Sequence, residues 1–144
     1  INLFREHYIA VASPAFIQKE RVKGLDDLKR VRILSMDKDL DWWHNFIAAM
    51  PADKRDCLQN VMQINHVRGI INGAISGLGI GFVPRYTVVT ELENQILADP
   101  FPHIKPAADE FYIYIKRERL QFEKNRGFID YLTTLNLLEP GTSP

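Results

Sequence analysis

Two patterns of apolar and polar positions alternate along the chain. Short apolar runs rich in β-branched and aromatic residues predict buried strands at residues 7–12, 31–35, 58–64, 79–83, 96–97 and 111–115. Segments whose apolar residues recur every three or four positions predict helices at residues 14–19, 42–50, 67–78, 86–93 and 120–138. Because strands and helices alternate almost throughout, we predict an α/β fold with a mostly parallel sheet flanked by helices.

The clearest helical periodicity lies at residues 67–78. Its apolar face consists of Val67, Ile70, Ile71, Ala74, Ile75 and Leu78. Asn65 is the predicted N-cap, and Gly77 is the predicted stop. In the same way Ser13, which precedes Pro14, is predicted to cap the helix at 14–19.

Asp39 or Asp41 is predicted to cap the helix that carries two adjacent tryptophans, Trp42 and Trp43. Neighbouring residues on a helix point about 100° apart. We therefore expect one indole to enter the core, while the other either packs against the core or lines a cleft or interface.

The segment Gly77-Leu78-Gly79-Ile80-Gly81 has the look of a nucleotide-binding loop, but its order is wrong. A dinucleotide fingerprint needs a strand, then glycines, then a helix, so that phosphate meets a helix N-terminus. Here the predicted order is helix, glycines, strand. The glycines are therefore predicted to end a helix and to allow close backbone packing.

The chain has 144 residues, of which 46% are hydrophobic, and its 18 basic and 18 acidic residues balance. This suits one domain with a real core and argues against a surface built for nucleic-acid phosphates. The apolar runs are too short to span a bilayer, so no membrane partner is expected. The lone Cys57 excludes an internal disulfide and suggests a reducing, cytoplasmic compartment. The chain begins at Ile1 without Met or a secretory signal, so we expect a piece of a longer polypeptide.

No metal, cofactor or catalytic site is predicted. The histidines are His7, His44, His66 and His103, and no two of them have the i, i+4 spacing of a pair of metal ligands on a helix. Ser13 and Ser35 lack the flanking glycines of a nucleophile elbow. The acidic run at residues 37–41 is more typical of a solvated loop and a helix cap than of an acid–base pair. We therefore predict that the chain is not an enzyme, although a small α/β hydrolase or transferase stays an alternative.

Ligands of such sheets bind beyond the carboxyl ends of the strands. These ends are predicted at Ser13, Ser35–Met36, Asn65–His66 and Pro84. Helix beginnings near Asn65-His66-Val67 and near Ser13 would present free N–H groups, which favour a carboxylate or similar anion. His66 is as often a solvated first-turn residue as one that faces a ligand.

Several segments resemble the effector-binding domain of LysR-type transcriptional regulators. Residues 8–14 (YIAVASP) resemble the strand that enters its second subdomain, and residues 24–28 (GLDDL) the loop and turn that follow. The most specific likeness is residues 70–84, IINGAISGLGIGFVP, which resemble the family's helix–Gly-x-Gly–strand–Pro segment. Residues 91–92 and 96–97 resemble its following helix and short strand, and residues 112–119 with residues 128–132 are similar to its closing strand and helix. Order and spacing agree over about 125 residues.

The resemblance implies the fold of type 2 periplasmic binding proteins, in which a small molecule binds between two α/β subdomains. It assigns residues 1–104 to the second subdomain and residues 105–144 to the returning strand and C-terminal helix of the first. The first subdomain is thus expected to be truncated. The family's N-terminal helix-turn-helix, through which DNA is bound, is not present in these residues.

The implied function is effector sensing and oligomerisation, as a dimer or tetramer, in a cytoplasmic bacterial transcription regulator. By resemblance, the position of Asn65 and the strand end Val83–Pro84 contact the effector, with no cofactor involved. The candidate effector-binding residues are Asn65, His66, Val67, Val83, Pro84, Ser35, Met36 and Ser13. A periplasmic solute-binding protein of a transporter is the alternative, because it shares the fold.

Overall fold

The computed structural model describes residues 1–135. The strands are β1 (Asn2–Glu6), β2 (Tyr8–Val11), β3 (Arg32–Ser35), β4 (Asn60–Gln63), β5 (Ile80–Pro84) and β6 (Asp109–Tyr112). The α-helices are α1 (Pro14–Lys19), α2 (His44–Ala49), α3 (Val67–Ile75), α4 (Val89–Glu93) and α5 (Glu123–Thr134). Single 3-10 turns are η1 (Leu25–Lys29), η2 (Asp41–Trp43), η3 (Ala52–Lys54), η4 (Arg85–Thr87) and η5 (Arg117–Gln121).

The chain folds into two compact units. One spans His7–Ala107, and the other combines Ile1–Glu6 with the described residues that follow Ala107. The predicted subdomain ranges, 1–104 and 105–144, place residues 1–6 with the larger unit. In the structure these six residues belong to the smaller unit, because β1 pairs antiparallel with β6. The assignment of the two units to a second and a first subdomain stays a prediction.

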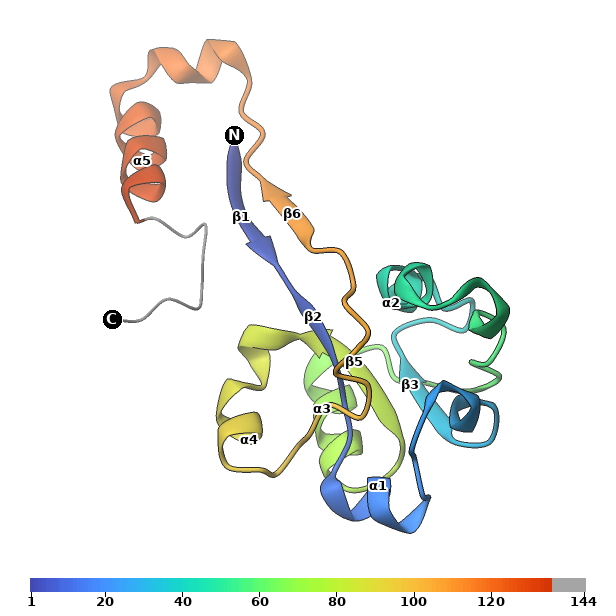
Figure 1. Ribbon diagram of the computed structural model, residues 1–144. Helices are drawn as coiled ribbons and strands as arrows, with labels where there is room; N and C mark the ends of the chain where they lie inside the picture. The colour runs from blue at the N-terminus through green and yellow to red at the C-terminus, as the bar shows by residue number, and fades with distance from the viewer. Residues whose placement is uncertain (136–144) are drawn as a thin grey trace. The chain divides into compact units, whose positions relative to one another are not determined.

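The larger unit is built on a four-stranded sheet with the order β2-β5-β3-β4, of which Figure 1 labels β2, β5 and β3. β3 is parallel to both β4 and β5, whereas β2 runs antiparallel to β5. The prediction of a mostly parallel α/β sheet is therefore confirmed. The predicted strand at 96–97 is wrong, since these two residues are not in a strand and the neighbouring Ala98 makes only an isolated bridge to Ala12.

Both faces of this sheet are buried, which is why its strands read as continuous apolar runs. Successive strand residues alternate between two core clusters. Ala10, Ile33 and Phe82 pack in one cluster, with residues of α1, η1 and α2. Ile9, Leu34 and Val83 pack in the other, with residues of α3.

The glycine-rich segment has the structural role predicted for it. Gly77 adopts a left-handed φ of 76° and follows the last turn of α3. The N–H of Gly77 donates to the Ala74 carbonyl, and the N–H of Leu78 donates to the Gly73 carbonyl, which is the pattern of a Schellman stop. At Gly79, an added Cβ would lie 2.5 Å from the Arg32 carbonyl oxygen, so only glycine fits.

Two of the predicted caps are wrong, by one residue at α3 and by two to four residues at η2. The N-cap of α3 is His66 and not Asn65, because the His66 imidazole accepts from the Gly69 N–H at 3.3 Å. The carboxylate that binds the first N–H groups of η2 belongs to Asp37 and not to Asp39 or Asp41. The Ser13 cap of α1 is confirmed, since its hydroxyl accepts from the Phe16 N–H at 3.1 Å.

The smaller unit consists of the β1–β6 ribbon, η5 and α5. The ribbon is held by an Arg5–Glu110 ion pair at 3.1 Å and by stacked Phe4 and Phe111 rings, whose centroids are 4.5 Å apart. The predicted helix at 120–138 is shorter than expected, because a 3-10 turn and the extended Phe122 precede α5. Its last predicted residues, 136–138, lie outside the described residues.

Candidate functional site

The parallel strands β3, β4 and β5 end at the same side of the sheet, which we call the carboxyl edge. It is formed by Ser35 and Met36 after β3, by residues 64–66 after β4, and by Val83 and Pro84 at the end of β5. Parallel pairing brings them together, since Ser35 lies opposite Gln63 and Leu34 lies opposite Gly81. Seven of the eight predicted residues therefore lie on or beside one edge.

The β3–β4 side of this edge is closed by one hydrogen bond between backbone groups and one from a side chain to the backbone. The Ile64 N–H donates to the Ser35 carbonyl at 2.8 Å, and the Gln63 side-chain amide donates to the Met36 carbonyl at 3.2 Å. Ser35 itself is fully buried, and its hydroxyl accepts from the Asp37 N–H at 3.4 Å. Ser35 therefore contributes to the shape of the edge, whereas Met36 is half-buried at its surface.

The connection from β4 to α3 supplies the exposed polar groups. Gln63, Ile64 and Asn65 line a shallow recess, and the Asn65 side chain has no hydrogen bond within the described residues. His66 is exposed and caps Gly69, so its imidazole is already used in holding the first turn. Among the predicted site residues, Asn65 is thus the one with an exposed polar side chain that makes no hydrogen bond within the described residues.

The first turn of α3 makes this part of the edge electropositive. The N–H groups of Val67 and Arg68 have no partner within the helix, and the helix dipole adds partial positive charge there. The Arg68 guanidinium lies in the same turn and pairs loosely with Glu91 of α4, with 3.7 Å between Nη1 and Oε1. An anion would meet favourable charge from the first turn of the helix, whereas Glu91 offsets the charge of Arg68.

The end of β5 is part of the core at this edge, because Val83 and Pro84 are both buried and Val83 packs in the cluster on the α3 face. The Pro84 carbonyl accepts from the Thr87 hydroxyl at 2.6 Å, and the Arg85 N–H donates to the His7 carbonyl at 2.8 Å. These bonds fix the strand end against η4 and the start of β2. The edge therefore combines exposed polar groups after β4 with a buried and firmly held strand end at β5.

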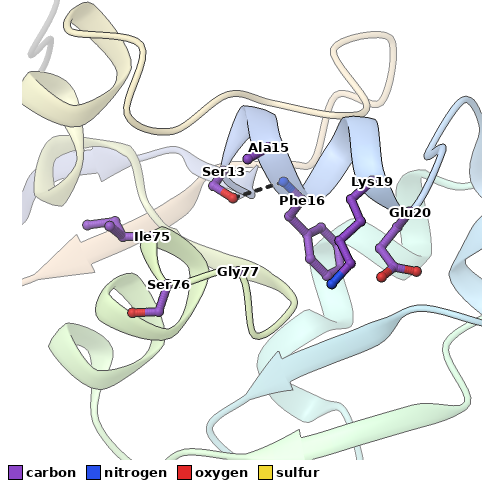
Figure 2. A pocket seen from close by; sticks show the side chains of 8 residues that line it. All are labelled: Ser13, Ala15, Phe16, Lys19, Glu20, Ile75, Ser76 and Gly77. Carbon is purple, nitrogen blue, oxygen red and sulfur yellow. Dashed lines mark hydrogen bonds between the residues drawn. The ribbon is translucent and has the colours of Figure 1, made fainter.

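Ser13 does not lie at this edge, and its predicted placement is wrong. Because β2 is antiparallel to β5, Tyr8 pairs with Pro84 at the carboxyl edge, while the end of β2 reaches the side where β3 and β5 begin. We call this side the opposite edge. Figure 2 shows Ser13 there, in a pocket between α1 and the turn Ser76–Gly77, with its hydroxyl bonded to Phe16.

Sequence reasoning missed two residues at the carboxyl edge. The Asp37 carboxylate accepts from the Asp41 and Trp42 N–H groups at 2.9 Å each. The Trp42 indole N–H donates to the Phe82 carbonyl at 2.6 Å, next to the strand end Val83. The acidic run and the tryptophan pair were visible in the sequence, but their positions relative to β5 were not.

The described residues also limit other chemistries. Residues 1–135 contain no group of three or more His, Cys, Asp or Glu side chains placed to hold a metal ion. None of the helices in this part of the chain is both long and apolar enough to cross a bilayer. Cys57 is a free thiol, fully buried in the core on the α2 face of the sheet.

Comparison with known families gives a match to the model described as the LysR substrate binding domain, over residues 1–136. A search of curated protein sequences gave no match.

Solved structures are similar in fold. The C-terminal domains of a LysR family protein from Agrobacterium tumefaciens align with a TM-score of 0.73 and 18% identity, over 96% of this chain and 67% of that one. The regulatory domain of AphB in Vibrio vulnificus gives 0.68 and 22%, over 94% and 67%. CrgA, a LysR-type transcriptional regulator from Neisseria meningitidis, gives 0.72 and 16%, over 93% of this chain and 46% of that one.

Proposed function

The chain belongs to the family of LysR substrate-binding domains, and from this premise we propose that it senses a small effector for a bacterial transcription regulator. The family and the similar solved structures are regulator domains and not enzymes. The periplasmic solute-binding alternative has the same fold, but the family match favours the regulator. The proposed place of action is therefore the cytoplasm.

The single observation that carries the proposed ligand site is the convergence of three groups at the carboxyl edge. These are the unbonded amide of Asn65, the electropositive first turn of α3, and the buried strand end Val83–Pro84. Donor groups and positive potential together suit a small anion such as a carboxylate. The proposed contacts are Asn65, His66, Val67, Val83, Pro84 and Met36, with Ser35 shaping the edge.

In the proposed full-length regulator, DNA is bound by an N-terminal helix-turn-helix that these 144 residues do not include. The larger unit is the second effector subdomain, and the smaller unit supplies part of the first. An effector that binds one arrangement of the subdomains more tightly shifts the population towards it, and thereby the spacing of the DNA-binding heads. Oligomerisation, as a dimer or tetramer, is part of this proposal.

The ligand site is tested with the full-length regulator and the variant Asn65→Ala. A panel of small carboxylates and amino acids is screened by the ligand-induced shift in thermal unfolding. For the ligands that stabilise the wild type, Asn65→Ala is expected to raise the concentration for half-maximal shift about tenfold, because a hydrogen bond to a charged group is lost. The unfolding temperature without ligand is expected to stay unchanged, because Asn65 is exposed.

Asn72→Ala is the matched control, since Asn72 is an exposed asparagine on α3, beyond its first turn. It is expected to leave both the unliganded stability and the dose–response curve as in the wild type. An unchanged curve for Asn65→Ala would contradict the placing of the ligand at this edge.

A further inference from the structure

Charge is unevenly distributed over the larger unit. Residues 19–32, which we call the basic segment, carry six basic and three acidic side chains, whereas the rest of the unit carries six basic and eight acidic ones. The segment runs from the last residue of α1 through η1 to the first residue of β3 (Figure 1). The balanced net charge of the whole chain therefore conceals a local excess of positive charge.

All three acidic side chains of the basic segment are already paired. The Arg30 guanidinium lies 3.0 Å from the Asp27 carboxylate and 3.8 Å from the Glu20 carboxylate. The Asp26 carboxylate lies 2.7 Å from the Lys54 ammonium. The other five basic side chains of the segment are exposed and make no ion pair within residues 1–135, these being Lys19, Arg21, Lys23, Lys29 and Arg32.

Hydrogen bonds fix the backbone that carries these five cations. The Arg21 carbonyl, just after α1, accepts from the Arg30 guanidinium at 3.1 Å. The Asp27 carboxylate accepts from the N–H groups of Lys23 and Gly24 at 2.8 and 3.0 Å. These bonds tie the chain before η1 to the chain within and after it. The cations are therefore held near one another, and a partner need not order the loop when it binds.

The side chains of the basic segment also indicate the class of partner. Its apolar side chains are all buried, namely Val22, Leu25, Leu28 and Val31. Protein interfaces have an apolar centre, and attachment to a membrane surface is strengthened by apolar side chains that insert into it. An exposed surface that is cationic and carries no apolar side chain instead suits the regularly spaced phosphates of a DNA duplex.

We propose that the basic segment is a second DNA contact of the regulator, which binds phosphates of the duplex without reading its sequence. This inference rests on the proposed function, because the N-terminal helix-turn-helix keeps the duplex close to the segment and so makes a weak contact effective. Each cation that neutralises a phosphate releases condensed counterions, so the contact raises the affinity most at low salt. DNA binding is then not confined to the helix-turn-helix.

The test measures the binding of the full-length regulator to a mixed-sequence DNA duplex by fluorescence anisotropy, between about 50 and 200 mM salt. The test variant combines Lys23→Gln with Lys29→Gln, which removes two exposed charges and leaves the backbone hydrogen bond of Lys23 in place. The affinity is expected to fall about tenfold at the lowest salt, and the slope of log affinity against log salt concentration is expected to become shallower by about two.

The matched control combines Lys38→Gln with Lys105→Gln, which removes the same charge from two exposed lysines of the larger unit that lie outside the segment. It is expected to leave both the affinity and the salt slope as in the wild type. Equal losses in the two double variants would show that net charge alone is responsible, and would overturn the inference.

The remaining outcomes separate this inference from the proposed function. If the wild type binds the duplex and the test variant binds it equally well, the basic segment is not a DNA contact, while the proposed function stands. If the wild type binds no duplex at all, the regulator function fails and this inference fails with it. Vesicles of phosphatidylserine and phosphatidylcholine form the last arm. A test variant that loses binding to these vesicles but not to the duplex would assign the segment to a membrane surface and overturn the DNA contact.

Discussion

The two edges of the four-stranded sheet differ in how many of their groups are already bonded or packed within the protein. At the opposite edge, backbone meets backbone so closely that a Cβ at Gly79 would overlap the Arg32 carbonyl, and the Ser13 hydroxyl is used up as a helix cap. At the carboxyl edge, the Asn65 amide is unbonded within the described residues and part of Trp42 is exposed. The opposite edge therefore contributes mainly to the stability of the fold, whereas the carboxyl edge has exposed polar and apolar groups that a ligand could contact.

This contrast has a physical reason. A polar group that is bonded inside the protein contributes to stability, and its removal leaves a partner unsatisfied. A polar group bonded only to water contributes little to folding and is available to a ligand. Substitutions at the opposite edge should therefore change the free energy of unfolding, whereas substitutions at the carboxyl edge should mainly change ligand response.

The largest effect is expected from Gly79→Ala. The new Cβ would lie 2.5 Å from a backbone oxygen, so β3 and β5 must separate at their beginnings. The free energy of unfolding, measured by urea denaturation, is expected to fall by about 2–3 kcal/mol. Gly24→Ala is the control, because a Cβ added at Gly24 would meet no atom within 4 Å and its φ of −163° is open to any residue. A Gly79→Ala variant as stable as Gly24→Ala would contradict this packing.

A smaller, pH-dependent effect is expected from Asp27→Asn in η1, just before β3. The pKa of the Asp27 carboxyl lies below its ordinary value of 3.8. The largest cause is the hydrogen bond that the Lys23 N–H donates to it. Bonds from the Gly24 N–H and the Arg30 guanidinium lower the pKa further, while burial acts to raise it. Because the pKa is lower in the folded protein, the charged carboxylate stabilises the fold above the unfolded-state pKa. This stabilisation is lost as the pH falls through the folded-state pKa.

Asp27→Asn is therefore expected to cost about 1 kcal/mol at pH 7, measured by denaturant unfolding. The difference from the wild type is expected to shrink below pH 3.8. A difference that stays constant down to the lowest pH at which the protein folds would show that the charge of Asp27 is not what stabilises this turn.

The smallest effect is expected from His66→Ala at the carboxyl edge. Its imidazole caps α3 through a long hydrogen bond of 3.3 Å at an exposed position, so the loss is expected to be about 0.5 kcal/mol at pH 7. Ser13→Ala, which removes the buried 3.1 Å cap of α1 at the opposite edge, is the matched comparison and is expected to cost more. A larger loss of unfolding free energy in His66→Ala than in Ser13→Ala would contradict the contrast between the two edges.

Local patterns were enough to predict most elements of the larger unit. Pro14–Lys19 forms the helix that the sequence predicts, because its Ser-Pro start acts through neighbouring residues alone. Gly77 stops α3 for the same local reason. The cap of α3 was harder, since Asn65 and His66 are adjacent polar residues and only the observed backbone geometry decides between them.

Side chains that depend on distant partners could not be placed from the sequence. Trp42 and Trp43 are identical in type and adjacent, but Trp43 is fully buried whereas Trp42 is half-buried. The difference between them arises from contacts with Phe82 and Leu34, which other strands supply. Likewise, the acidic run 37–41 gave no sign that Asp37, and not Asp39 or Asp41, would bind the N–H groups of η2.

By itself the sequence determined most of the order of strands and helices in the larger unit, the burial of both sheet faces and the glycine stop, because each follows from periodicity or from the backbone freedom of single residues. Only the tertiary structure decided which strand ends meet. The antiparallel direction of β2 sends Ser13 to the opposite edge, while parallel pairing brings Ser35, Asn65 and Pro84 to the carboxyl edge. Strand direction is set by hydrogen bonds and packing between segments far apart in the chain, and no local pattern encodes it.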